Sequence, residues 1–140
     1  MKLGTLEKLD LLAAAEERAL EAALSQALHA MRHLEGQSQV LAAYQARLTA
    51  GWRDGAVIAA AEAQRAGLFS LRAQDAALQL AASLATARER VNEAATALAI
   101  QRAKRERLRA RLDQSRAQAL RAALERAARN QPHRPAAPLI

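Results

Sequence analysis

The first third of the chain carries an apolar residue at every seventh position. From Leu6 onward this series contains only alanine and leucine: Leu6, Ala13, Leu20, Ala27, Leu34, Leu41 and Leu48. The positions three residues later form a more mixed series: Leu9, Glu16, Ala23, Ala30, Gln37 and Tyr44. A seven-residue apolar repeat is typical of a helix that packs along another helix in a coiled coil. We therefore expect a first helix over about residues 5–50, capped by Thr5 and ending at Gly51.

The second half of the chain has its own seven-residue repeat. Its two series are Ala77, Leu84, Val91, Leu98, Arg105 and Leu112, and Leu80, Ala87, Ala94, Gln101 and Leu108. No proline occurs before Pro132, so nothing forces a helix to break before that residue. We expect a second helix over about residues 68–130, followed by a disordered, proline-containing tail over residues 131–140.

The segment between the two repeats contains the chain's strongest turn signal, because Gly51 and Gly55 flank Asp54. We expect the tip of a hairpin over about residues 51–67, with a short helix that Gly67 closes. The alternative is a sharper turn at Gly55, with Gly67 inside one continuous helix. The expected fold class is all-α: one domain over residues 1–130, built as a long antiparallel two-helix coiled-coil hairpin with a short helical or irregular tip.

The distribution of charge favours the antiparallel arrangement. The net charge is +7, but residues 102–134 contain eleven basic and three acidic residues, whereas residues 1–101 contain ten basic and eleven acidic ones. Folding the chain back places the acidic start of the first helix beside this basic run, with Leu6 near Leu112 and Leu48 near Leu71. The second helix should extend past the first and leave four arginines without an acidic helix opposite them: Arg116, Arg121, Arg126 and Arg129.

Composition and motifs argue against catalysis. The chain has no cysteine, which excludes disulfides and thiolate chemistry, and only 2% of its residues are aromatic. His29 and His33 have a metal-binding spacing, but no third ligand completes a site. We find no glycine-rich phosphate loop, signal peptide or apolar run of the roughly 20 residues that span a bilayer. We expect a cytoplasmic protein that is not an enzyme and has no metal or cofactor.

The pattern Gln37-x-x-x-Leu41-x-x-Tyr44-Gln45-x-x-Leu48, followed by a glycine-containing tip and Phe69, resembles the FliJ/YscO family of flagellar and type III secretion export proteins. The resemblance covers most of residues 5–130. It implies a non-enzymatic stalk, peripheral to the inner membrane, that links a hexameric export ATPase to the export gate.

The same resemblance suggests two contact regions. Contacts with the gate or with substrate chaperones would fall on Gln37, Leu41, Tyr44, Leu48 and Phe69, and more loosely on Ala73, Ala76 and Leu80. The overhanging arginines, from Arg116 to Arg129, would engage the ATPase ring.

Two other readings remain open at this point. The basic last third of the chain could bind the phosphates of nucleic acid or of an anionic membrane surface, with a steep salt dependence. No aromatic residues are interleaved with these arginines, and this favours a protein partner. The hairpins could also pair into a purely structural four-helix dimer.

Overall fold

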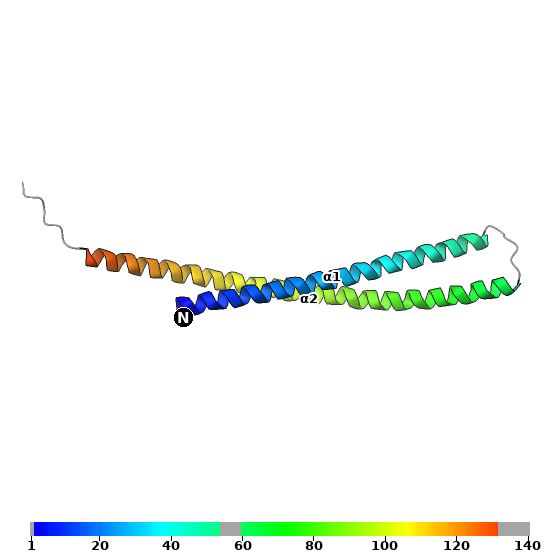
Figure 1. Cartoon of the computed structure of the whole chain (residues 1–140), viewed down its shortest axis with the longest axis horizontal. Coiled ribbons are helices and arrows are strands. Elements are labelled where there is room, and N and C mark those ends of the chain that lie inside the picture. The colour runs from blue at the N-terminus through cyan, green and yellow to red at the C-terminus, as the bar shows by residue number, and fades with distance from the viewer. Residues whose placement is uncertain (1, 54–59, 132–140) are drawn as a thin grey trace, which may run out of the picture. The chain divides into compact units, whose positions relative to one another are not determined.

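The computed structural model describes residues 2–53 and 60–131, which form two helices, α1 (Leu3–Arg53) and α2 (Ala60–Asn130) (Figure 1). These residues contain no strand. The two helices pack against each other as an all-α helical hairpin, so the expected fold class is confirmed. The centre of the expected tip, residues 54–59, and the expected tail after residue 131 lie outside the described residues.

The helix ends differ from the expected ones. α1 begins at Leu3, and the carbonyl of Lys2 accepts the backbone N–H groups of Thr5 and Leu6 at 3.1 Å each, so Thr5 lies inside the first turn. α1 also continues through Gly51. α2 runs through Gly67 without interruption, so the expected helix end there is wrong and the continuous helix is correct. A glycine costs a helix only about 1 kcal/mol relative to alanine, which packing against a second helix can offset.

Contacts within the hairpin divide it into two compact units. The terminal unit combines Met1–Glu17 with Ile100–Ile140, and the central unit covers Arg18–Ala99. Each unit therefore contains one segment of α1 and one segment of α2, and each is described separately below.

The terminal unit has a small apolar core. Leu6 and Leu112 keep only 4% and 3% of their surface exposed. Leu6 lines one cavity together with Gln114 and Ser115 of α2, which confirms that it lies near Leu112. In Figure 1 the end of α2, coloured orange to red, extends past the first turns of α1, coloured blue.

The central unit is packed mainly through small residues. Its buried apolar residues are Ala73, Ala87 and Leu98 of α2, and several leucines of α1 are half-buried. Leu48 lines a cavity together with Ser70 and Gln74, as the antiparallel register predicts. Because alanine side chains are small, this interface buries little apolar surface per residue.

The interface of α2 follows the predicted repeat, and both of its seven-residue series are buried or half-buried throughout. On α1 the first series is also buried or half-buried, but the second series is exposed at all six positions, so that prediction is wrong. The interface uses the positions four residues after the first series instead: Asp10, Glu17, Leu24, Met31, Ser38 and Gln45. Positions three and four residues apart lie on adjoining parts of a helix face, and contacts with α2 decide between them.

Candidate interaction surfaces

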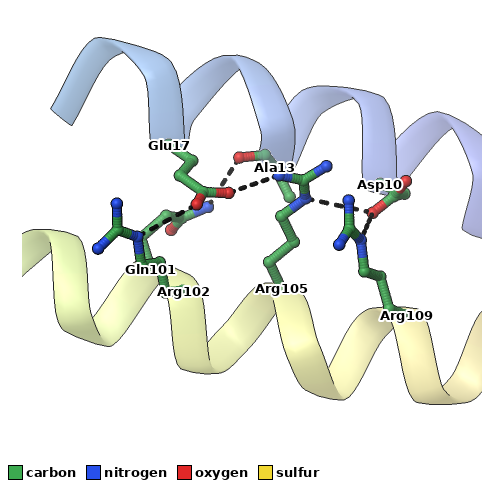
Figure 2. Close-up of polar contacts among 7 residues, drawn as sticks. All are labelled: Asp10, Ala13, Glu17, Gln101, Arg102, Arg105 and Arg109. Atoms are coloured by element: carbon green, nitrogen blue, oxygen red, sulfur yellow. Dashed lines mark hydrogen bonds and ion pairs between the residues drawn. The ribbon is translucent and has the colours of Figure 1, made fainter. Parts of the chain in front are cut away.

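Arg105 of α2 joins two carboxylates of α1 in the terminal unit (Figure 2). Its Nη1 donates a hydrogen bond of 2.6 Å to Glu17 Oε2, and its Nε lies 3.6 Å from Asp10 Oδ1. All three side chains are largely covered, with 22%, 14% and 23% of their surface exposed for Arg105, Glu17 and Asp10. These charges lie within the helix interface, so they specify which segment of α2 pairs with the start of α1.

Further arginines extend this contact along one flank of α2. Arg102 Nε donates to Glu17 Oε1 at 3.3 Å, and Arg109 Nε lies 3.8 Å from Asp10 Oδ1. Arg116 Nη2 lies 3.7 Å from Glu7 Oε1. We call this side of the terminal unit the charged flank: Glu7, Asp10, Glu17, Arg102, Arg105, Arg109 and Arg116. The acidic start of α1 therefore faces the basic run of α2, as the charge distribution predicts.

The hydrogen bond between Arg105 and Glu17 keeps both side chains ionised. The Arg105 guanidinium, with help from Arg102, lowers the pKa of Glu17 below its ordinary value, although partial burial opposes this. Glu17 in turn raises the pKa of Arg105. Both groups stay charged near neutral pH, which suits a permanent structural contact.

Gln101 adds an uncharged polar contact to the same interface. It is 8% exposed, and its Nε2 donates a hydrogen bond of 3.3 Å to the backbone carbonyl of Ala13 (Figure 2). A polar residue at an interface position favours the register in which its hydrogen bond can form.

The four arginines assigned to the ATPase side do not share one environment. Arg116 pairs with Glu7, so the expectation that it faces no acidic residue is wrong. We define the overhang as residues 117–131, all of which are exposed. Arg121 and Arg129 make no hydrogen bond or ion pair with any residue that the structure describes, and Arg126 Nε donates to the carbonyl of Ala122 within its own helix at 3.3 Å.

The residues assigned to the gate side lie in the central unit and differ in exposure. Tyr44 and Phe69 are 43% and 56% exposed, whereas Leu41 and Leu48 are half-buried in the helix interface. Gln37 is exposed, and its Nε2 lies 3.2 Å from His33 Nε2. The leucines can therefore support a contact surface from beneath, while the aromatic side chains are accessible.

The helical repeat places Tyr44 and Phe69 on one side of the central unit. Ala30 of α1 and Ser83 of α2 line the same groove. Tyr44 follows Ala30 by two seven-residue repeats, and Phe69 precedes Ser83 by two repeats. Residues separated by whole repeats lie on the same face of a helix, so Tyr44 and Phe69 lie on the side of the hairpin that carries this groove. Gln37 follows Ala30 by one repeat and joins them. We call Gln37, Tyr44 and Phe69 the aromatic flank.

Comparisons with known proteins add no relative to this picture: no family model, curated protein or solved structure matches the chain. None of the helices in the described residues is long and apolar enough to cross a membrane. Within residues 2–53 and 60–131, no cluster of three or more histidine, aspartate or glutamate side chains could hold a metal ion.

Proposed function

We propose that this protein is a non-enzymatic stalk component of a flagellar or type III protein export apparatus, in the cytoplasm beside the inner membrane, and links a hexameric export ATPase to the export gate. The observation that carries the proposal is the overhang, a fully exposed helical segment with three arginines that pair with no acidic residue of α1. The resemblance of the aromatic-flank sequence to the FliJ/YscO family supports it.

The ATPase contact falls on Arg121, Arg126 and Arg129. Glu125 is the one acidic residue in the overhang, so this segment attracts an acidic surface. Arg116 belongs to the charged flank and acts indirectly, since its ion pair with Glu7 joins the base of the overhang to α1.

The gate or chaperone contact falls on the aromatic flank. Exposed tyrosine and phenylalanine are unusual in this chain, whose aromatic content is 2%, and aromatic side chains often dominate the energetics of protein interfaces. Leu41 and Leu48 position this flank by filling the helix interface beneath it.

Copurification with the cognate export ATPase tests the ATPase contact. Arg121→Glu/Arg126→Glu/Arg129→Glu should abolish copurification. Arg32→Glu/Arg47→Glu/Arg72→Glu, which changes the net charge equally at exposed positions of the central unit, should preserve it. Absence of copurification by the wild-type protein, together with an unaltered ATPase rate, would remove the proposal.

Export assays test the gate contact separately. Tyr44→Ala and Phe69→Ala should each reduce export while helicity by circular dichroism and ATPase copurification stay at wild-type levels. Normal export by the double variant would remove this half of the proposal and leave the ATPase contact standing.

The second candidate function is binding to nucleic acid or an anionic membrane surface. It is favoured by one observation, the formal charge of +6 in the terminal unit, which has thirteen basic and seven acidic residues. This function predicts binding to generic DNA or anionic vesicles that weakens steeply with salt and falls equally when any exposed arginine from 102 to 129 is removed.

A further inference from the structure

Lys104, Arg107 and Arg111 form a second group of cations on α2, distinct from the charged flank. Lys104 and Arg111 follow Arg102 and Arg109 by two residues, which turns a helical side chain by about 200°. All three cations are exposed and make no hydrogen bond or ion pair with any residue in the described parts of the chain. The acidic residues of α1 thus neutralise one flank of α2 and leave the other unneutralised.

These cations border a groove with an apolar wall. Leu9 and Leu12 of α1 and Leu108 of α2 line it together with the three cations, and its volume is about 730 Å³. Leu9 and Leu12 are 38% and 62% exposed, so a bound partner could cover both. Glu16 is the one acidic residue among those that line the groove. We call this surface the open flank.

We infer that the open flank binds a third helix, supplied by a partner protein, whose apolar stripe is bordered along one edge by carboxylates. Leucines on one wall and cations on the other require those two features in the bound helix. The start of α1 shows that α2 accepts such a helix: buried Leu6 is followed by Glu7 and Asp10, which pair with arginines of α2. The inference does not rest on the export assignment.

Charge argues against a second copy of this chain as the occupant. The terminal unit carries +6, and a second copy would bring the same cations to the groove. Phosphates of nucleic acid would neutralise the cations but would leave Leu9 and Leu12 uncovered. An amphipathic helix that bears carboxylates would both cover the leucines and neutralise the cations.

Binding of two designed peptides to the full-length protein tests the inference. Both are fluorescent, helix-forming peptides of about 18 residues, or five turns, with the same leucine stripe. One has glutamates beside the stripe and the other has lysines. Fluorescence anisotropy should show binding of the glutamate peptide and at least about tenfold weaker binding of the lysine peptide, a difference of roughly 1.4 kcal/mol.

Variants of the protein locate the site. Lys104→Glu/Arg107→Glu/Arg111→Glu should weaken binding of the glutamate peptide at least about tenfold, and this variant should bind the lysine peptide more tightly than the glutamate peptide. Leu12→Gln, at an exposed position that tolerates the change, should weaken both peptides about fivefold or more. Two controls, Arg32→Glu/Arg47→Glu/Arg72→Glu and Arg121→Glu/Arg126→Glu/Arg129→Glu, should bind the glutamate peptide like the wild type.

Several results would overturn the inference. These are equal binding of both peptides, unchanged binding by the Leu12 and open-flank variants, or loss of binding in the overhang variant. Binding to DNA or anionic vesicles without binding to the glutamate peptide would identify a phosphate surface. A dimer in sedimentation that dissociates in the Leu12 variant would identify a second copy as the occupant. Circular dichroism of each variant confirms that helicity is intact.

Discussion

Arg105 explains why charged residues occupy the interface between α1 and α2. Its guanidinium contacts both Glu17 and Asp10, so two acidic residues of α1 can face α2 at positions where a coiled coil normally has apolar side chains. The sequence predicts that acidic and basic residues meet here. It does not predict which atoms pair, because that depends on which flank of each helix faces the other.

Glu17→Gln tests the electrostatic part of this contact. A carboxylate with a lowered pKa stabilises the folded state fully above its ordinary, unfolded pKa, and this stabilisation is lost as pH falls through the lower folded pKa. The melting temperature of Glu17→Gln should therefore be below that of the wild type at neutral pH, and the two should converge in acid.

Thermal melts followed by circular dichroism between neutral pH and about pH 3 would measure this convergence. Glu89→Gln is the matched control, because Glu89 is exposed and makes no ion pair among the described residues. A difference in melting temperature between Glu17→Gln and wild type that stays constant over the whole pH range would contradict the electrostatic account.

Leu112→Ala tests the apolar core of the terminal unit. Leu112 is 3% exposed, so its truncation should lower the free energy of unfolding by about 2–4 kcal/mol. Leu120 lies on the same helix but is 62% exposed, and Leu120→Ala should cost less than about 0.5 kcal/mol. Urea denaturation measures the free energy of unfolding of both variants. Similar losses for the two would mean that Leu112 is not part of a buried core.

At the scale of whole helices, the seven-residue repeats predict α2 better than α1. Both series of α2 are dominated by apolar residues, so they identify the interface without further information. On α1, polar residues occur both three and four positions after the leading series, as at Glu16 and Glu17. Only the ion pairs with α2 show that Glu17 lies in the interface while Glu16 is exposed.

Gln101→Leu tests whether a polar contact sets the register of these helices. The variant loses the hydrogen bond to the Ala13 carbonyl but buries a leucine, so its free energy of unfolding should stay equal or rise by up to about 1 kcal/mol. Its register should become less uniform. The sequence contains no cysteine, so spin labels can be attached selectively at Lys8→Cys and Gln114→Cys to measure the register. A distance distribution as narrow as that of the wild type would refute this role.

Gly67→Ala tests the finding that α2 is continuous through this residue. A Cβ atom at this position would meet nothing within 4 Å, and the backbone there is helical. The substitution should therefore raise the free energy of unfolding by about 0.5–1 kcal/mol. Destabilisation in thermal or urea melts would indicate a helix end at this residue instead.

At the scale of the whole molecule, charge is concentrated in one of the two units. The terminal unit carries +6, whereas the central unit, with eight basic and seven acidic residues, carries +1. The sequence predicts the excess of positive charge in residues 102–134 from composition alone, but not the two units. It also predicts the exposure of Arg121, Arg126 and Arg129, but it misses the pairing of Arg116 and the apolar wall of Leu9 and Leu12, which depend on how the helices face each other.

Truncation after Gln118 tests whether the overhang serves binding more than folding. Residues 117–131 are all exposed, so the loss should change the free energy of unfolding by less than about 1 kcal/mol while it abolishes ATPase copurification. Removal of residues 132–140 alone is the control and should preserve binding. A truncated protein that melts far below the wild type would mean that the overhang packs against something in the folded state.

The two carboxylates around Arg105 make the consequences of natural variation unequal for the two helices. A change at Asp10 leaves the guanidinium neutralised by Glu17, so mutations at Asp10 should be tolerated. A change at Arg105 instead removes the cation that both carboxylates share. Among the described residues, Glu17 then keeps only Arg102 and Asp10 keeps only Arg109, two exposed arginines, in a partly covered site where poorly compensated charge is costly. Evolutionary drift should therefore accumulate sooner at Asp10 of α1 than at Arg105 of α2.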